Sequence, residues 1–372
     1  MARESVVLEI GGSEADDLYP DLAAVEVETG DDAPATFRLR IAVSRDAGDG
    51  AWSYLDEERF RVWSEVSVRV GFEGGGTEEV VSGYVTRVRP WFDADPGRCA
   101  LEVEGMDASV LLDREEKLKD WPGKKDSDIA REVLSAYGLS AQVEETDVVH
   151  EEALSTIIQR ETDLEFLKRL ALRNGFSCWV EGRTAHFGPV PADAAPQPVL
   201  AAHFGGETSL AWFAPVVDAL RPAEVSMFQL DRLTRDVLSA DAASSARRPL
   251  GRMDASALLP GGVDPGKVYV ARNAATGAPE MTALCQGVFD EGSWFVTAEG
   301  QTRPAAYEHV LKPRGLVTVK GVGESYSGVW YVSYVRHTLD RDGYTQFFRL
   351  RRDALLPTGA EDFGAAAGLG LL

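Results

Sequence analysis

The first 112 residues alternate apolar and polar side chains with a period of two. The alternation is clearest in segments 5–10, 23–29, 36–43, 64–72, 79–90 and 98–107. Clusters of Gly, Asp and Pro separate these segments, as turns separate strands. A period of two predicts strands with one buried face. Several such strands at short spacing favour a small barrel or sandwich, so residues 1–112 are expected to form a first tube-like β-barrel.

A helical period replaces this alternation after residue 113. Residues 126–138 and 162–175 are predicted to be helices, each ending at a glycine. Thr162 and Glu165 make a capping box, in which each side chain accepts an N–H group of the first turn. Residues 176–188 predict a hairpin that turns near Glu181 and Gly182. Residues 113–200 are therefore expected to form an α+β module, with a Pro- and Ala-rich linker at 189–200.

The β pattern returns between residues 201 and 355, which are expected to form a second tube-like β-barrel with inserted segments. Residues 218–234 contain a strand or two, and 239–266 are rich in Ala, Ser, Gly and Pro and predict a surface excursion. Residues 278–300 begin like a helix and end like a strand, before a last β block at 314–352. Residues 356–372 are expected to be a flexible tail. The predicted fold is mainly β with an α+β insert.

Two similar phrases stand far apart in the chain: SGYVTRVRP at 82–90 and SGVWYVSYVRH at 327–337. Each follows a strand and a Gly-rich turn, and each leads through an Asp-containing turn into a final strand. Chance is one explanation, because β-hairpins recur everywhere. The shared order favours duplicated barrels instead. A trimer of such a chain presents six barrels, so a threefold body can look sixfold from one side.

The charge balance of the chain narrows the classes of partner that it can bind. The 372 residues include 60 acidic and 38 basic ones, so the net charge is −22. Such an excess argues against nucleic acid and anionic membranes as partners. No apolar run has the length of a signal peptide or a membrane span. Cys99, Cys178 and Cys285 are far apart and odd in number, which indicates buried free thiols in a reducing cytoplasm.

No segment meets the requirements of a nucleotide loop or a zinc site. Residues 320–325 contain Gly-x-Gly but no third glycine. Residues 150–154 read HEEAL, which places Leu154 where a zinc protease needs histidine. For His337, in a predicted strand, a structural hydrogen bond is a better interpretation than catalysis. The histidines are scattered over the chain, at His150, His186, His203, His309 and His337.

Other candidate residues also favour structural roles. Glu57/Glu58 and Asp93/Asp95 are pairs of the kind that glycoside hydrolysis uses, but they lie in predicted loops without a sugar cleft. The run Arg349–Arg352 predicts an exposed strand end or, alternatively, a contact with an acidic neighbour. No catalytic, cofactor-binding or metal-binding residue is assigned, and an enzyme is not expected. Tryptophans in β patterns are expected in a core or a subunit interface: Trp52, Trp63, Trp179, Trp294 and Trp330.

Residues 157–182, IIQRETDLEFLKRLALRNGFSCWVEG, resemble a segment of contractile-tail hub proteins. These are the phage late control protein D group, the hub portion of VgrG proteins and the hubs of extracellular contractile injection systems. LEVEGMDASVLLDREEKLKDW (101–121) and DSDIAREVLSAYGL (126–139) look like the upstream segment of that family. Residues 295–300 and 317–353 look like its C-terminal segment. The resemblance covers most of residues 65–353.

The resemblance implies a homotrimer with two tube-like barrels per chain and pseudo-sixfold symmetry. Such a hub sits between a hexameric inner tube and a trimeric spike, beside other baseplate proteins. No repetitive β-structure follows the hub segments, so the spike is expected to be a separate protein. The expected location is a phage tail-like particle, assembled in the bacterial cytoplasm, with no membrane insertion.

A structural hub is therefore the leading hypothesis, and no cofactor or metal ion is expected. If the acidic excess faces the channel, it repels anionic cargo. Two alternatives stay open: a tail-associated cell-wall hydrolase and a carbohydrate-binding β protein.

Overall fold

The computed structural model describes residues 4–31, 33–73, 75–150, 157–190, 194–221, 224–231, 233–245, 247–270, 275 and 277–364. These residues form a mainly β fold with an α+β module, as the hydrophobic pattern predicts. The predicted domain limits at residues 112, 200 and 355 stay predictions. The last eight residues of the expected tail lie outside the described residues.

The first β unit coincides with the six predicted segments. Its inward side chains, among them Leu8, Leu39 and Val103, form one buried core. Alternate residues of a strand point to opposite faces, so the outward side chains remain polar. The strands are β1 (Glu4–Ile10), β2 (Ser13–Glu14), β3 (Leu22–Gly30), β4 (Thr36–Ala42), β5 (Glu65–Phe72), β6 (Thr77–Trp91) and β7 (Ala100–Asp107).

The middle module contains both predicted helices and the predicted hairpin. Thr162 caps the second helix, because its Oγ1 accepts the N–H of Glu165 at 3.3 Å. Ile129 and Phe166 are fully buried where the two helices meet the module's strands. The elements are β8 (Lys119–Trp121), α1 (Asp126–Ser135), β9 (Ser140–Val143), β10 (Ile157–Gln159), α2 (Asp163–Arg173), β11 (Ser177–Glu181) and β12 (Thr184–Gly188).

The second β unit surrounds a core that includes Trp330, Phe348 and Leu350, all fully buried. Its strands are β13 (Gln197–Ala201), β14 (Leu210–Val217), β18 (Val296–Thr302), β19 (Leu316–Lys320), β20 (Gly328–Asp340) and β21 (Gly343–Arg352). The end of the predicted linker is thus a strand, because β13 pairs with β19 in parallel.

An insertion between β14 and β18 forms a separate layer, which we call the arm. It contains β15 (Glu224–Leu230), β16 (Val237–Ala242), β17 (Lys267–Tyr269) and α3 (Ala278–Gly292). Met227, Met281 and Cys285 are buried where α3 packs against the sheet. The predicted surface excursion therefore begins with a strand, β16, and the helix-then-strand pattern at 278–300 is confirmed.

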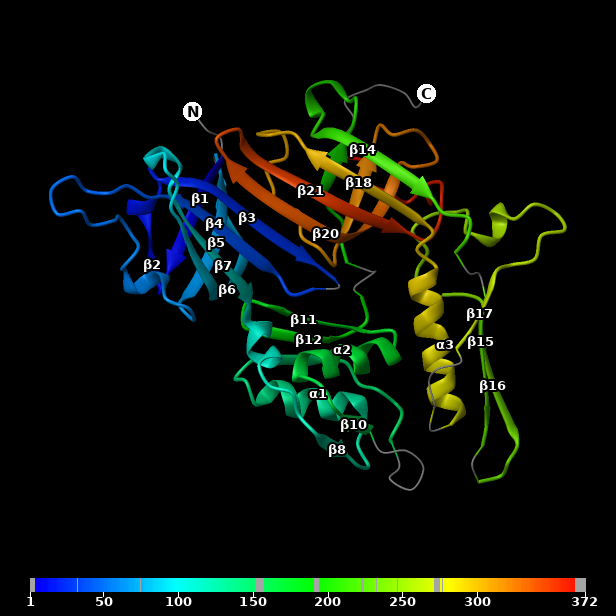
Figure 1. The fold of residues 1–372 in the computed structure, drawn as a ribbon. Coiled ribbons are helices and arrows are strands. Elements are labelled where there is room, and N and C mark those ends of the chain that lie inside the picture. The colour runs from blue at the N-terminus through cyan, green and yellow to red at the C-terminus, as the bar shows by residue number, and fades with distance from the viewer. Residues whose placement is uncertain are drawn as a thin grey trace.

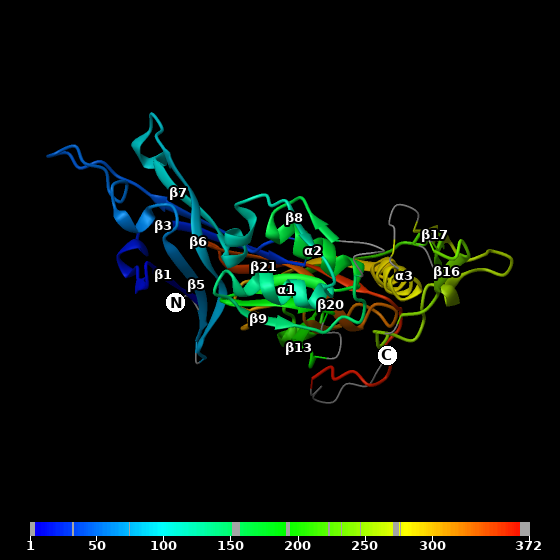
Figure 2. The same ribbon diagram turned by 90° about the horizontal axis from the view of Figure 1, so that it is seen from below.

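The two β units share one continuous sheet (Figure 1). One edge of β20 pairs with β21, and its other edge pairs first with β19 and then with β3 of the first unit. We call the pairing of β20 with β3 the internal joint. Figure 2 shows the first unit and the arm at opposite ends, with the middle module between them.

The strand order repeats across the internal joint. The order β3-β4-β7-β6-β5 in the first unit corresponds to β14-β18-β21-β20-β19 in the second, and every neighbouring pair is antiparallel. The chain order of these strands is also the same. The arm interrupts only the second copy, between its first two strands. The last three strands of each copy contain the phrases that look alike in the sequence.

Candidate interaction surfaces

Each unit has a β-bulge near the start of its first strand. The register of β3 with β4 shifts by one residue at Ala23, and the register of β14 with β18 shifts at Ala211. Each bulge directly follows a leucine, Leu22 or Leu210. Because bulges are conserved features of related sheets, their coincidence supports a duplication.

A second bulge also occurs at matching places. The register of β6 with β7 shifts at Thr86, and that of β20 with β21 shifts at Ser333. The Thr86 hydroxyl donates to the backbone carbonyl of Glu104 at 3.4 Å, and the Ser333 hydroxyl donates to that of Arg349 at 3.1 Å. The two copies therefore share the bulge and the side-chain hydrogen bond that accompanies it.

The bulges set the residue correspondence between the copies. Val88 and Val335 are equivalent, each two residues after the shared bulge. Gly83 then corresponds to Trp330, because each lies three residues before the bulge. Gly83 pairs with Val66 of β5, and Trp330 pairs with Val317 of β19. The Val-Arg ends of the two phrases thus coincide, whereas the sequence match of Gly83 with Gly328 is two positions out of register.

One face of this sheet is exposed and carries alternating charges from β18 to β6. Arg38 of β4 lies 3.8 Å from Glu26 of β3 and 3.2 Å from Glu104 of β7. Opposite charges on neighbouring strands support the register, although exposed pairs each contribute only about 0–1 kcal/mol. Arginines balance the acidic residues of this face, so the acidic excess of the chain lies elsewhere. Its charged residues include Glu26, Glu28, Arg38, Arg40, Arg87, Arg89, Glu102, Glu104, Glu299, Arg336, Arg349 and Arg351.

The internal joint extends over six residue pairs, from Tyr334 with Gly30 to Leu339 with Val25. Beyond the ladder, the N–H of Asp31 donates to the carbonyl of Ser333 at 3.1 Å. The two units are therefore bound by main-chain hydrogen bonds, which are independent of side-chain identity.

Arg314 connects three parts of the chain at one end of this joint. It precedes β19 in the second unit, and its Nη1 donates to the carbonyl of Gly30 in the first unit at 2.5 Å. Its guanidinium also lies 5.3 Å from the ring centre of Trp179 in the middle module. The backbone of Arg314 has a positive φ of 60°, which is costly for a residue with a side chain.

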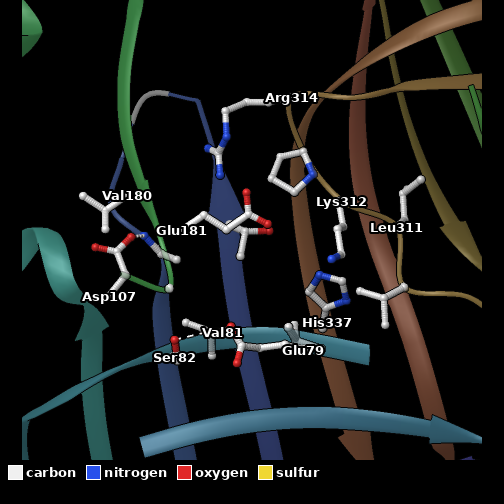
Figure 3. A pocket seen from close by; sticks show the side chains of 16 residues that line it. Glu79, Val81, Ser82, Asp107, Val180, Glu181, Leu311, Lys312, Arg314 and His337 are labelled. Atoms are coloured by element: carbon white, nitrogen blue, oxygen red, sulfur yellow. Dashed lines mark hydrogen bonds between the residues drawn. The ribbon is translucent and has the colours of Figure 1, made fainter. Parts of the chain in front are cut away.

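A pocket opens beside Arg314, where the three parts meet (Figure 3). Asp107 of β7 lies on one side, and its carboxylate accepts the N–H groups of Ala35 and Ser109 at 2.6 and 2.9 Å. Burial raises the pKa of Asp107, and these hydrogen bonds oppose that shift. Asp107 and Arg314 thus hold loops and strands together at this pocket.

His337 lines the same pocket and, like Asp107, is buried. Its Nδ1 lies 2.7 Å from the hydroxyl oxygen of Tyr344. Desolvation lowers the pKa of His337 to about 3, so the imidazole is neutral at pH 7. A hydrogen-bonded structural role, as the sequence predicts, fits this geometry.

A second buried polar cluster connects the middle module to the arm. His150 Nε2 lies 3.0 Å from Asp126 Oδ1 at the start of α1, and Asn174 donates to the other oxygen of Asp126 at 2.7 Å. Arg173, at the end of α2, forms an ion pair with Glu280 of α3. Burial lowers the pKa of Arg173. The HEEAL motif begins at His150, but its residues 151–154 lie outside the described residues.

The two carboxylate pairs have local partners. Glu57 and Glu58 form ion pairs with arginines two and three residues further along, at 2.6 and 3.0 Å. Asp93 and Asp95 accept backbone N–H groups of their own turn at 2.9 and 3.1 Å. These contacts are those of loop-forming residues, and the two pairs lie on separate loops.

Cys99, Cys178 and Cys285 are all buried free thiols, and burial raises the pKa of Cys178 to about 12. His186 stacks on Trp179 with 4.5 Å between ring centres. Across the described ranges, no group of three or more His, Cys, Asp or Glu residues is arranged to hold a metal ion. No helix in these ranges is long and apolar enough to cross a membrane.

The arginine run is only partly an exposed strand end. Arg349 and Arg351 form ion pairs with glutamates at 3.0 and 3.2 Å. Arg352 is fully buried, which corrects the prediction. It donates to the carbonyl oxygens of Leu250, Ser327 and Leu356 at 3.0, 3.1 and 2.8 Å. No local pattern predicts this role, because Leu250 and Ser327 come from loops far away in the chain and only Leu356 is near in sequence.

The tryptophans divide between core and surface. Trp330 lies in the core of the second unit, and Trp294 stacks on Tyr331 with 5.4 Å between ring centres. Trp52 packs against the first core. Trp63 is different, because 43% of it is exposed just before β5. An exposed tryptophan at this position is a candidate contact for another chain.

A family model described as the Alg8 N-terminal domain matches residues 5–341. The chain belongs to this family. The match runs through the first β unit and the middle module and ends just before β21, the last strand of the second unit. A search of curated proteins found no match.

Several solved structures share the fold of this chain at low sequence identity. The 43 kDa tail protein of prophage MuSo2 from Shewanella oneidensis has a TM-score of 0.68 and 17% identity, over 95% of this chain and 99% of that one. A tail protein from Neisseria meningitidis MC58 has a TM-score of 0.66 and 15% identity, over 94% and 97%. A type VI secretion system component of E. coli has a TM-score of 0.55 and 12% identity, over 93% and 76%. At these identities the likeness shows the fold alone, which is that of phage tail proteins.

Proposed function

We propose that this protein is the structural hub of a contractile injection system or phage tail, as in the late control protein D and VgrG hub proteins. In this role it forms a homotrimer that adapts a hexameric inner tube to a trimeric spike. The observation that carries the proposal is the duplicated unit: β3-β4-β7-β6 and β14-β18-β21-β20 lie side by side in one sheet. Three chains then present six similar units, which match the sixfold symmetry of the tube. The trimer as a whole keeps the threefold symmetry of the spike.

The exposed charged face of the sheet is proposed to line the channel. Its arginines and glutamates alternate between strands, so the channel wall is charged but not acidic. On this proposal the lumen lacks the acidic excess that would repel anionic cargo. The acidic excess would instead lie on outer surfaces, among the other baseplate proteins, as the particle assembles in the bacterial cytoplasm.

A role without catalysis is part of the proposal. The candidate carboxylates serve their own loops, and His337 is neutral and hydrogen-bonded inside the protein. A mechanical adaptor needs large interfaces rather than shifted pKa values in a cleft. A turbidity assay on cell walls tests this part: clearing that Glu58→Gln abolishes would favour a hydrolase.

The decisive measurement is the solution mass by light scattering, alone and with the candidate spike protein. A mass of three chains in either sample, followed by image averages with six quasi-equivalent densities, is the expected result. A monomer in both samples would overturn the hub proposal.

A further inference from the structure

The internal joint covers one edge in each unit and leaves the equivalent edge of the other unit open. In the first unit, β3 is covered by the second half of β20. The equivalent of β3 is β14, and the equivalent of β20 is β6. Among the described residues, β14 pairs only with β18, and residues 86–91 of β6 pair only with β7. Each copy of the sheet therefore has one unpaired edge. The edge of β14 is equivalent to β3, and the edge of β6 at residues 86–91 is equivalent to the part of β20 that pairs with β3.

Both open edges carry exposed apolar side chains. Trp91 and Phe92, at the end of β6, are 50% and 57% exposed, and Val216 of β14 is 58% exposed. The equivalent residues of the internal joint, Thr338, Leu339 and Glu28, all lie on paired strands inside the sheet. Apolar groups on an open sheet edge are a risk of aggregation unless another chain covers them.

Trp63 gives a third correspondence. Its N–H donates to the carbonyl of Val85 at 2.7 Å, as the N–H of Arg314 donates to that of Val332 at 2.8 Å. Both residues have positive φ, 74° and 60°. Trp63 is thus the equivalent of Arg314, the residue that crosses the internal joint.

We infer that β14 of one copy lies against residues 86–91 of β6 in a second copy, in the register of the internal joint. Trp63 of that second copy then contacts the end of β14, at Asp218, where Arg314 contacts Gly30 within the chain. The contact is head-to-tail, so it generates a ring if the rotation closes. This inference rests on the proposed trimer and names the strands that join its chains.

Two prolines shape this contact. Pro90 and Pro215 are the equivalents of His337 and Val27, which pair in the internal joint. Neither proline has an N–H group, so this rung forms no main-chain hydrogen bond. The hydrogen-bonded rungs two residues away on either side, and the apolar side chains, must hold the contact. Proline on each open edge also discourages pairing with unrelated strands.

Cysteine pairs test the register directly. Val216 and Arg89 correspond to Glu28 and Arg336. Asp31 and Ser333 are a hydrogen-bonded pair, and pair types alternate along an antiparallel ladder, so Glu28 and Arg336, three positions away, are a non-hydrogen-bonded pair. Such opposite residues have Cα atoms about 4.5 Å apart, within the range of a disulfide. The chain carrying Val216→Cys and Arg89→Cys should form covalent trimers on mild oxidation, seen on non-reducing gels and reversed by reductant.

The controls use the pseudo-symmetry of the chain. Glu28→Cys with Arg336→Cys should crosslink within one chain, and Val216→Cys with Arg38→Cys, which puts the second cysteine in the middle of the sheet, should give no covalent trimer. If the protein is a trimer in solution and the Glu28/Arg336 control forms its disulfide, but the Val216/Arg89 variant forms no covalent trimer, this inference is overturned and the hub proposal stands. A monomeric mass for the unmodified protein, alone and with the spike, would overturn both.

Trp63→Ala provides a second test. The expected result is at least a tenfold weaker trimer, measured by sedimentation at several concentrations, with an unchanged monomer melting curve. An unchanged trimer affinity would contradict the place given to Trp63.

Discussion

Arg352 shows how a single buried side chain can join its own strand end to two loops that are distant in the sequence. Its guanidinium gathers three backbone carbonyls and lies 5.6 Å from the ring centre of Trp330. Desolvation lowers the pKa of Arg352 to about 10, so it keeps its charge at pH 7. Arg352→Met should lower the free energy of unfolding by on the order of 3 kcal/mol, because each abandoned buried carbonyl costs about 1–3 kcal/mol.

Chemical denaturation checks this value, with Arg349→Met as the matched control. Arg349 is an exposed partner of Glu299, so its loss should cost less than about 1 kcal/mol. Equal losses in the two variants would contradict the role given to Arg352.

His337 should make the stability depend on pH. Its pKa falls from 6.5 in the unfolded chain to about 3 in the folded one, so below pH 6.5 the unfolded chain binds more protons. Stability should therefore fall as pH decreases from 6.5 towards 3, by up to about 1.4 kcal/mol per pH unit from this group, and stay constant above 6.5. Unfolding curves of His337→Gln between pH 7 and 5 should have a shallower slope than those of the natural protein. Parallel slopes would show that His337 does not titrate on unfolding.

At the scale of elements, a close backbone contact joins the middle module to the arm. A Cβ atom on Gly287 of α3 would lie 2.9 Å from the backbone N of Gly175, just after α2. Gly287→Ala should gain up to about 1 kcal/mol of helix propensity if the helix were free. We expect destabilisation instead, seen as faster hydrogen exchange in α3. Thr282→Ala, on the exposed side of α3, serves as control; slower exchange in the Gly287 variant would mean that the helices do not touch there.

The sequence predicted these elements unevenly, for physical reasons. Periodicity and capping identified α1, α2 and the strands of the first unit, because their signals are local. The short strand β13 was hidden within a Pro- and Ala-rich segment, since its pairing with β19 depends on a distant partner. The duplication was visible in the Val-Arg ends of two phrases, but its register was not, because bulges leave no mark in an unaligned sequence. Of the residues at the proposed contact between copies, only Trp63 was predicted from the sequence, as a core or interface residue. Its equivalence to Arg314 could not be predicted.

For the whole molecule, Arg314 should decide whether the parts unfold together. It contacts the first unit through Gly30 and the middle module through Trp179. A charge-assisted hydrogen bond contributes about 1.5–3 kcal/mol, and a cation–π contact adds about 0.5–2 kcal/mol. Arg314→Ala should lower the first calorimetric transition and separate it from the second. Lys312→Ala, in the same loop, should leave the thermogram unchanged; a single unshifted transition for Arg314→Ala would mean that the joint does not depend on it.

The shared bulges also bear on which mutations the gene can tolerate. A strand alternates its faces residue by residue, and Thr86 and Ser333 are the extra residues that the bulges insert. Deleting either one places Val85 beside Arg87, or Val332 beside Tyr334, opposite adjacent residues of the partner strand, so every side chain keeps its face. Deleting Val103 from β7, where no extra residue can absorb the loss, turns the side chains beyond it to the opposite face and brings Glu104 towards the core. In a library of single-codon deletions, the two bulge positions should therefore be more permissive than the middle of β7, and insertions should persist in the turns of the arm.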